Sequence, residues 1–261
     1  MDTQALVTTL TAATQTLDDL TGVRLPQRAY LILQRAIRNM LLPPGEMVLE
    51  DDVAQALGMS RTPIHEALIR LQSEDLVAII PRHGFQVVPL LVDVLRDIYE
   101  IAEGIEGIAV ALAAERATPG DMAELEKLQA QAETALAAND LIAWAEIDDL
   151  FHRTLLRSAK NQRLSRLADQ YAAHLYRARL YTIRLRANLT LSISEHTAVL
   201  AAIRAGNPHQ AQALHQAHRH RTRGEILGVI EALNPNMHFR VDYGQCSAGH
   251  PAVPNLIRRK Q

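Results

Sequence analysis

The sequence predicts a mainly α-helical protein in two parts, an N-terminal winged helix-turn-helix with a small β-hairpin and a C-terminal antiparallel all-α bundle. Three observations support this. The composition is 48% hydrophobic but only 4% aromatic, with abundant Ala and Leu, which favours helices over sheets. Two short helical patterns flank Gly58 and are followed by two β-rich runs. After Pro89 the chain reads as helical segments with short joints.

Length and charge restrict the classes of protein. A chain of 261 residues can hold two domains, each with its own core. The formal charge of −2 means that a nucleic-acid surface must be a local patch. A single cysteine, Cys246, argues against disulfides and fits a reducing compartment. With no signal-like segment and no apolar run of membrane length, we expect a cytoplasmic protein without membrane contact.

Residues 1–24 are expected to form an N-terminal arm. Apolar residues recur there at spacings of three and four, as on one face of a helix. That face consists of Leu6, Leu10, Ala13, Leu17 and Leu20. Two interpretations stay open: a helix that docks on the body of the protein or on a partner chain, and a frayed tail rich in threonine.

Residues 25–89 have the pattern of a winged helix-turn-helix. A first helix begins near Leu25 and ends before the Pro-Pro-Gly sequence at 43–45. A second covers residues 50–57 and stops at Gly58, and a third is expected to be capped by Ser60. The third helix should bury Ile64, Ala67, Leu68 and Leu71.

A β-hairpin, or wing, is predicted after the third helix. Residues 77–80 and 85–88 are β-rich runs, and they flank the sequence Pro-Arg-His-Gly at 81–84. The composition of the tip, two basic residues and a glycine that allows close backbone approach, suits contact with phosphates or the minor groove.

The third helix carries the side chains expected to contact DNA. Arg61, Thr62 and His65 lie opposite its buried stripe, and its N-terminus offers free backbone N–H groups to a phosphate. The alternative is an ordinary helical subdomain with solvated charge, and bulk charge does not favour DNA, so the placement of the side chains decides. The expected DNA-binding residues are Ser60, Arg61, Thr62, His65, Arg82, His83 and Gly84.

The string MSRTPIHEALIRLQSEDLVAIIPRHGFQV strongly resembles the GntR family of bacterial transcription regulators, whose typical string is SRTPVREAL followed by a wing with R-x-G. The resemblance covers about 65 residues. It implies that Arg61 and Thr62 contact bases or phosphates and that Gly84 makes the wing turn. Two residues depart from the pattern. His65 stands where the family usually has arginine, and Asp51 stands where some members have an arginine that touches DNA, so base preference and affinity are expected to differ.

Residues 93–234 predict a helical bundle. Prolines, glycines and asparagines separate the segments, and short joints favour antiparallel neighbours. The six expected helices cover roughly 93–117, 121–138, 140–160, 161–187, 189–206 and 208–233. Residues 235–261 change character and are expected to form an extended tail without its own core.

Four residues of this bundle could hold a metal ion. Asp148 and His152 are four apart and share a helix face, and His196 and His218 lie in later segments. One carboxylate with three imidazoles suits Zn²⁺, Ni²⁺, Mn²⁺ or Co²⁺, with zinc as the default choice. The alternative is that these are ordinary surface histidines, since the chain has 11, and His215 competes with His218 for the ligand role.

The strings DDLFHRTLLRSAKN and EHTAVLAAIRAGNPHQA, with His218, resemble the FCD effector domain of the FadR subfamily, over residues 93–230. The resemblance implies metal ligands from D-x-x-x-H, from EH and from a histidine 22 residues further on, which selects His218 over His215. The count of six helices resembles the VanR-like branch of that subfamily.

The same resemblance implies a small carboxylate effector, an organic or sugar acid, bound beside the ion. Ala102 stands where many relatives have an arginine that pairs with the effector. Tyr99 and Glu106 share a helix face with Ala102. His174 and Tyr181, seven apart in the fourth segment, could supply polarity instead, although both are as well explained as residues at the edge of the core.

The sequence therefore predicts a homodimeric DNA-binding regulator, expected to be a repressor and not an enzyme. It would bind a palindromic double-stranded operator under the control of a small organic acid. Two alternatives remain: a metal-dependent hydrolase on the bundle with Glu106 as general base, and a regulator without a small-molecule effector.

Overall fold

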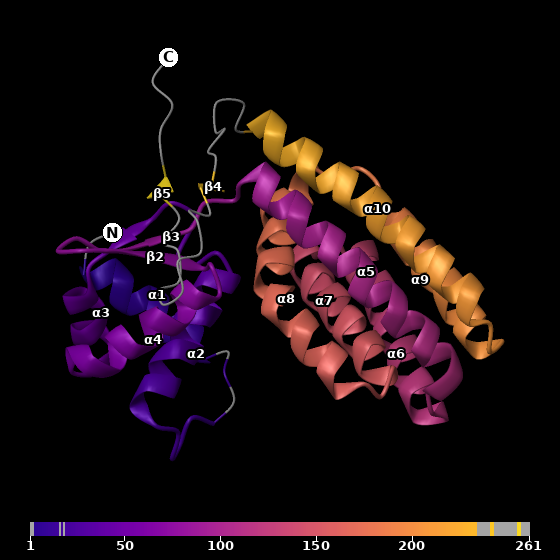
Figure 1. Ribbon diagram of the computed structural model, residues 1–261, viewed down its shortest axis with the longest axis horizontal. Coiled ribbons are helices and arrows are strands. Elements are labelled where there is room, and N and C mark those ends of the chain that lie inside the picture. The colour runs from indigo at the N-terminus through magenta and orange to yellow at the C-terminus, as the bar shows by residue number, and fades with distance from the viewer. Residues whose placement is uncertain (1–2, 16, 18, 234–240, 243–254, 257–261) are drawn as a thin grey trace. The chain divides into compact units, whose positions relative to one another are not determined.

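The computed structural model is drawn in Figure 1. The chain divides into two compact units, Met1–Leu91 with Asn236–Gln261, and Val92–Pro235. None of the helices in the described part of the chain is long and apolar enough to cross a membrane. The structure describes residues 3–15, 17, 19–233, 241–242 and 255–256.

The first unit contains the predicted helix-turn-helix. After α2 (Leu25–Arg38) come α3 (Glu50–Leu57) and α4 (Arg61–Ser73), and α4 packs on both α2 and α3. Gly58 ends α3 in the left-handed conformation, where a side chain would be strained. The predicted inward residues of α4, Ile64, Ala67, Leu68 and Leu71, are all buried.

The N-terminal arm contains α1 (Thr3–Gln15), and this helix docks on the protein's own body. Leu6, Leu10 and Ala13 are almost fully buried, and α1 contacts α2 and α3. The apolar face predicted for this segment therefore extends the core of the helix-turn-helix. Its burial removes apolar surface from water, which is the main term that favours packing.

A three-stranded antiparallel sheet completes the first unit, in the order β1-β3-β2. β2 (Val77–Ile80) and β3 (Gly84–Val87) form the predicted wing. β1 (Met47–Val48) was not predicted, because two residues carry no periodicity, and it pairs with β3 through Val48 and Phe85.

The wing turn is formed by residues before Gly84, which the family resemblance had placed in the turn itself. His83 N–H donates to Ile80 O at 2.9 Å, which places Pro81 and Arg82 at the centre of the turn, with Arg82 at a φ of 66°. Gly84 instead opens β3 at a φ of 84°. A Cβ on Gly84 would collide with the backbone of Val48, so glycine is required for β1 to pair closely with β3.

The second unit is the predicted antiparallel bundle, and six α-helices form it within the described residues. α5 contacts α7, α8, α9 and α10, and Figure 1 shows it running alongside α10. The short 3-10 helix η1 (Ile183–Leu185) extends α8. The six helices are α5 (Val92–Arg116), α6 (Pro119–Ala137), α7 (Leu141–Ser158), α8 (Gln162–Thr182), α9 (Leu189–Arg204) and α10 (Pro208–Leu233).

Local capping explains several of the helix starts. Thr118 and Asp121 form a capping box at α6, in which each side chain bonds the other's backbone N–H. The side chains of Asp140 and Asn161 accept backbone N–H groups at the starts of α7 and α8. These capping side chains begin new helices at the breaks that the sequence pattern predicted.

Within the predicted tail, 235–261, the structure describes two short strands. β4 (Val241–Asp242) pairs antiparallel with β5 (Asn255–Leu256). The rest of this segment, including Cys246, lies outside the described residues.

The Gly84→Ala substitution is expected to destabilise the first unit, because it adds a collision with Val48 to the strain of a positive φ. Gly45→Ala is a matched control, since Gly45 has a φ of 85° but no atom within 4 Å of the added Cβ. Strain of this kind costs about 1–3 kcal/mol. Denaturant unfolding should show a clearly larger loss for Gly84→Ala, and equal losses would mean that the close approach to β1 does not matter.

Candidate functional site

The predicted DNA-reading face is exposed at the N-terminus of α4. Arg61, Thr62 and His65 all point away from the buried stripe. Ser60 occupies the N-cap position with extended backbone, but its side chain makes no capping hydrogen bond, so that expectation was wrong. The first backbone N–H groups of α4 are therefore not capped by Ser60, and an N-terminus of this kind favours an anion such as phosphate.

Two acidic side chains of α3 pair with the two cationic positions of this face. Arg61 forms an ion pair with Asp51, and His65 Nδ1 lies 3.3 Å from Glu50 Oε1. Asp51 was singled out in the sequence as a departure at a DNA-contacting position. Its carboxylate holds the Arg61 guanidinium across the surface, where such a pair is weak and readily exchanged for a phosphate or a base.

The wing places Arg82 and His83 at an exposed tip, and Gly84 follows them at the start of β3. Within the first unit, the described structure therefore puts all seven predicted DNA-binding residues on α4, at its N-cap or in the wing.

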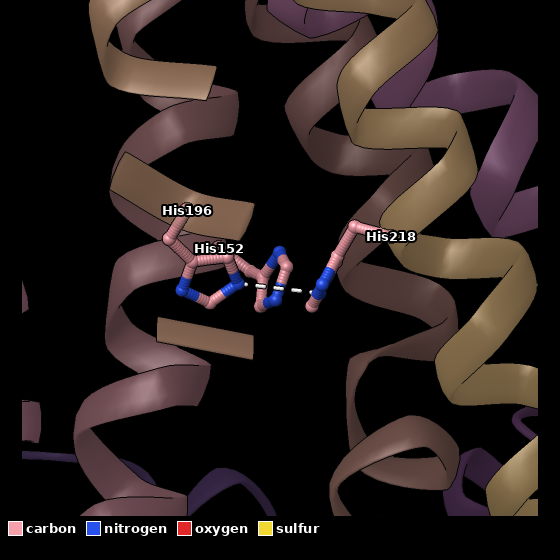
Figure 2. A group of neighbouring side chains, drawn as sticks. All are labelled: His152, His196 and His218. Carbon is pink, nitrogen blue, oxygen red and sulfur yellow. Dashed lines mark hydrogen bonds between the residues drawn. The ribbon is translucent and has the colours of Figure 1, made fainter. Parts of the chain in front are cut away.

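Three predicted metal ligands converge in the centre of the second unit. His152 of α7, His196 of α9 and His218 of α10 are all buried, and one nitrogen of each lies within 4.8 Å of the others. Figure 2 shows the three imidazole rings turned toward one another from three helices. The Nε2 atoms of His196 and His218 are 3.2 Å apart. Phe151 stacks on the His196 ring at 4.3 Å and fixes its orientation.

Asp148, the fourth predicted ligand, lies beside two of these histidines. Its Oδ2 is 3.8 Å from His152 Nε2, and its Oδ1 is 3.9 Å from His196 Nε2. The Oδ2 atom also accepts from Arg179 Nε at 2.8 Å. Oδ2 is thus held by a guanidinium of α8 and lies beside His152, while Oδ1 faces His196.

A carboxylate outside the cluster orients His218. The Nδ1–H of His218 donates to Glu195 Oε2 at 2.6 Å, which leaves Nε2, turned toward His196, as the unprotonated nitrogen that could bind an ion. Arg221 in turn donates to both oxygens of Glu195. In the sequence, the only indication of a role for Glu195 was that it directly precedes His196.

His215 belongs to a second, adjoining cluster. Its Nε2–H donates to Glu106 Oε2 at 2.8 Å, and Arg219 binds both oxygens of the same carboxylate. His152 Nδ1 lies 3.4 Å from Glu106, so the His152 ring stands between the two clusters. Glu106, His152 and His215 also lie close enough to hold an ion, but Glu106 is already bound by the guanidinium.

Burial controls the protonation of the cluster. Desolvation lowers the pKa of His152 to about 4 and holds the pKa values of His196 and His218 well below the usual range. Burial alone would raise the pKa of Asp148, but Arg179 and the neighbouring histidines lower it strongly. At neutral pH the site therefore offers three unprotonated imidazoles and an ionised carboxylate, the forms that bind metal ions.

The donor set fits a divalent ion. Neighbouring ligand atoms about 2.1 Å from an ion are roughly 3.0 Å apart in an octahedral site and roughly 3.4 Å apart in a tetrahedral one. The two Nε2 atoms of His196 and His218 are 3.2 Å apart. An octahedral ion held by four protein ligands would keep two positions open. Among the residues that the structure describes, buried His152 Nε2 has no hydrogen-bond partner. A buried polar atom without a partner is costly, and an ion would satisfy Nε2.

The four predicted effector residues lie in different surroundings. Tyr99 is buried and its pKa is raised by desolvation, whereas Glu106 is bound by Arg219 and His215. His174 is buried in α8, and Tyr181 is 36% exposed. Of the four, only Glu106 lines an open cavity of about 410 Å³, which Ala102 and Ile105 also line.

Sequence reasoning missed the buried arginines. Arg179 and Arg219 are each 4% exposed and pair with Asp148 and Glu106. Arginine is seldom fully buried unless it is paired, and pairing between helices leaves no local pattern. The only signal for Arg219 was its place directly after His218.

An exposed helix-turn-helix with a wing, followed by a helical bundle with a buried histidine cluster, defines a two-part transcription regulator. The profile of bacterial regulatory proteins of the gntR family matches residues 25–87, and that of the FCD domain matches residues 97–221. The chain belongs to the GntR family and carries an FCD domain.

Relatives found by sequence comparison are also transcription regulators. An uncharacterised regulator from the TAR-I ttuE-ttuC' intergenic region of Agrobacterium vitis is 39% identical over 50% of this chain and 78% of its own length. Escherichia coli McbR is 31% identical over 63% of this chain and 75% of its own length.

Solved structures share the fold. The E. coli McbR/YncC structure has a TM-score of 0.70 at 26% identity, over 81% of this chain and all of that one. A GntR regulator from Rhodococcus sp. RHA1 has a TM-score of 0.64 at 22% identity, over 78% of this chain and 97% of that one, and this likeness supports the fold alone.

Removing the carboxylate of Glu106 is expected to destabilise the bundle severely. Glu106→Leu leaves Arg219 buried without its partner, and breaking a buried pair costs about 3–5 kcal/mol. As the control, Glu124→Ala removes an exposed pair with Arg157 and should cost at most about 1 kcal/mol. Denaturant unfolding distinguishes the two, and similar small losses would show that Arg219 is solvated.

Proposed function

We propose that the protein is a homodimeric repressor that binds a palindromic DNA operator in the cytoplasm and is controlled by a small organic acid at a metal-centred pocket. One observation carries the proposal: three buried, unprotonated imidazoles converge beside Asp148, in a chain whose other unit exposes a DNA-reading helix. Two such helices in a dimer would address half-sites about one helical turn of DNA apart.

The proposed ligands are Asp148, His152, His196 and His218, and zinc is the ion we expect first, ahead of nickel, manganese and cobalt. When bound, a divalent ion with open positions would accept a carboxylate of the effector. The chain's own contribution is to hold the imidazoles unprotonated and oriented, through burial and through Glu195.

A chain of contacts supports coupling to the DNA-binding unit. His218 and Arg219 are adjacent in α10, and Arg219 holds Glu106 of α5. α5 begins at Val92, five residues after the wing strand β3 ends. An effector that moves α10 would therefore shift α5, which is joined directly to the wing. Such a shift would change the spacing or relative mobility of the two DNA-binding domains in the dimer and lower operator affinity.

Glu106, the general base that the hydrolase alternative needs, is already engaged by other side chains. A general base needs a free carboxylate near the ion, and Arg219 and His215 bind Glu106 on both oxygens. The named relatives are transcriptional regulators. We therefore propose regulation without catalysis. A regulator that lacks a small-molecule effector is tested by the metal and acid titrations described below.

Arg61→Ala is expected to weaken operator binding by about 5- to 150-fold, because a bidentate arginine contact to guanine contributes about 1–3 kcal/mol. His65→Ala should weaken it less and alter base preference. Gel-shift titration on operator and on scrambled DNA separates base contacts from phosphate contacts. Arg96→Ala, an exposed arginine of α5, serves as the control. Wild-type affinity for Arg61→Ala would show that the assigned face of α4 is wrong.

His218→Ala is expected to abolish ion binding, whereas His215→Ala should retain it. Both histidines are buried on α10, but only His218 has its Nε2 beside His196. Metal analysis after gentle purification, followed by zinc titration, gives the stoichiometry. About one ion per chain should raise the Tm of the wild type, and exposed His209→Ala is a surface control. Less than half an equivalent, with no uptake on titration, would contradict the metal-centred pocket.

A further inference from the structure

A second, smaller cavity lies beside the histidine cluster. The space between its walls, open solvent included, is about 220 Å³, and two of the proposed ligands, Asp148 and His218, line it. Its other walls include Trp144, Arg186, Ser192 and Thr222, which none of the sequence reasoning had placed at the site.

Helix geometry explains why these residues share the cavity. Trp144 precedes Asp148 by four residues on α7, and Ser192 precedes His196 by four on α9. On α10, Thr222 follows His218 by four. Four residues are slightly more than one turn, or about 6 Å along a helix. The three helices thus contribute a second polar layer, one turn away from the layer that holds the ion.

Two donors in this layer are buried and lack a hydrogen-bond partner among the described residues. They are Trp144 Nε1, in a residue 1% exposed, and Arg186 Nε, in a residue 8% exposed. Arg186 uses another nitrogen, Nη2, toward Glu225 at 3.4 Å. An indole N–H and a guanidinium can only donate, so the missing partner must be an acceptor.

The hydroxyl groups of the layer are already engaged. Ser192 Oγ accepts from Arg221 at 2.9 Å, and Thr222 Oγ1 donates to the Arg219 carbonyl at 3.1 Å. The layer therefore presents donors and positive charge to the cavity. A ligand group with acceptor oxygens and negative charge matches it, and an ammonium group does not.

We propose that the effector is an acid with two carboxylates, one directed to the ion and the second bound by Trp144 Nε1–H and Arg186 Nε–H. This inference rests on the proposed function, because the first carboxylate needs the ion. The two layers fix the separation of the two groups at about one helical turn. A monocarboxylate would leave both buried donors without a partner.

The larger cavity on the other side of His152 is a poorer match. Trp144 and Arg186, the two buried donors without a partner, do not line it. Arg153, Arg179 and Arg219 do line it, but Arg179 and Arg219 are already paired with Asp148 and Glu106. Ala102 leaves that side without the arginine implied by the family resemblance. In the proposed site the cation is Arg186, which lines the smaller cavity and directly follows η1.

Calorimetric titration of the zinc-loaded, full-length protein tests the proposal, with acetate as the one-carboxylate probe and malonate, succinate and glutarate as two-carboxylate probes. We expect at least one dicarboxylate to bind 10-fold or more tightly than acetate. Trp144→Phe keeps the aromatic ring but removes the N–H, and Arg186→Lys keeps the charge but removes Nε. Each variant should cost the favoured dicarboxylate about 10-fold in affinity, while acetate affinity and zinc stoichiometry stay unchanged.

Arg204→Lys, at a surface arginine paired with Glu126, is the matched control and should bind like the wild type. The proposal is overturned if no dicarboxylate exceeds acetate, or if both variants keep the wild-type preference. In those cases acetate binding that requires zinc would leave the metal-centred function standing. If zinc-loaded protein binds neither acetate nor any dicarboxylate, both proposals are wrong: the protein does not sense an acid, and Trp144 and Arg186 do not bind a second carboxylate.

Discussion

The two-point ion pair between Glu106 of α5 and Arg219 of α10 is the interaction on which the centre of the bundle depends. Each residue is 4% exposed. Taking two charges out of water costs several kcal/mol per ion, and only full hydrogen bonding offsets it. Arg219 covers both oxygens, and His215 adds a further N–H. Because the pair is satisfied internally, it can stay buried among the helices, and the same burial lowers the pKa values of the neighbouring histidines and keeps them unprotonated.

The fold was largely accessible from local sequence signals. The six bundle helices begin and end within a few residues of their predicted bounds, since proline, glycine and capping side chains mark the joints. Ser60 shows the limit of such signals, because it has the right residue type and backbone for a cap but makes no capping bond. β1 shows another limit. Its pairing with β3 joins residues almost 40 positions apart, and only Gly84 at the contact hints at it.

The site was accessible only where its residues repeat along one helix. The four-residue spacing of Asp148 and His152 indicated a shared face, and the structure places both at the cluster. Helix periodicity alone could not choose between His215 and His218, which are both buried on α10. The family resemblance selected His218, and in the structure the two differ in their partners, Glu106 and Glu195. Arg179 and Arg186 gave no signal at all, since their burial is set by carboxylates on other helices.

Charge balance explains why an ion and an acid would bind together in the proposed pocket. Asp148, Glu106 and Glu195 each already face a guanidinium, from Arg179, Arg219 and Arg221. A divalent cation held by three neutral imidazoles and one paired carboxylate would therefore add positive charge that the buried Asp149, which lies 3.7 Å from Arg179, offsets only in part. In a dry interior such charge is costly, and an anionic ligand that reaches the ion removes the cost. The buried arginines, which by themselves oppose a cation, thus make ion binding and acid binding favour each other, and reciprocal coupling of this kind is what a sensor requires.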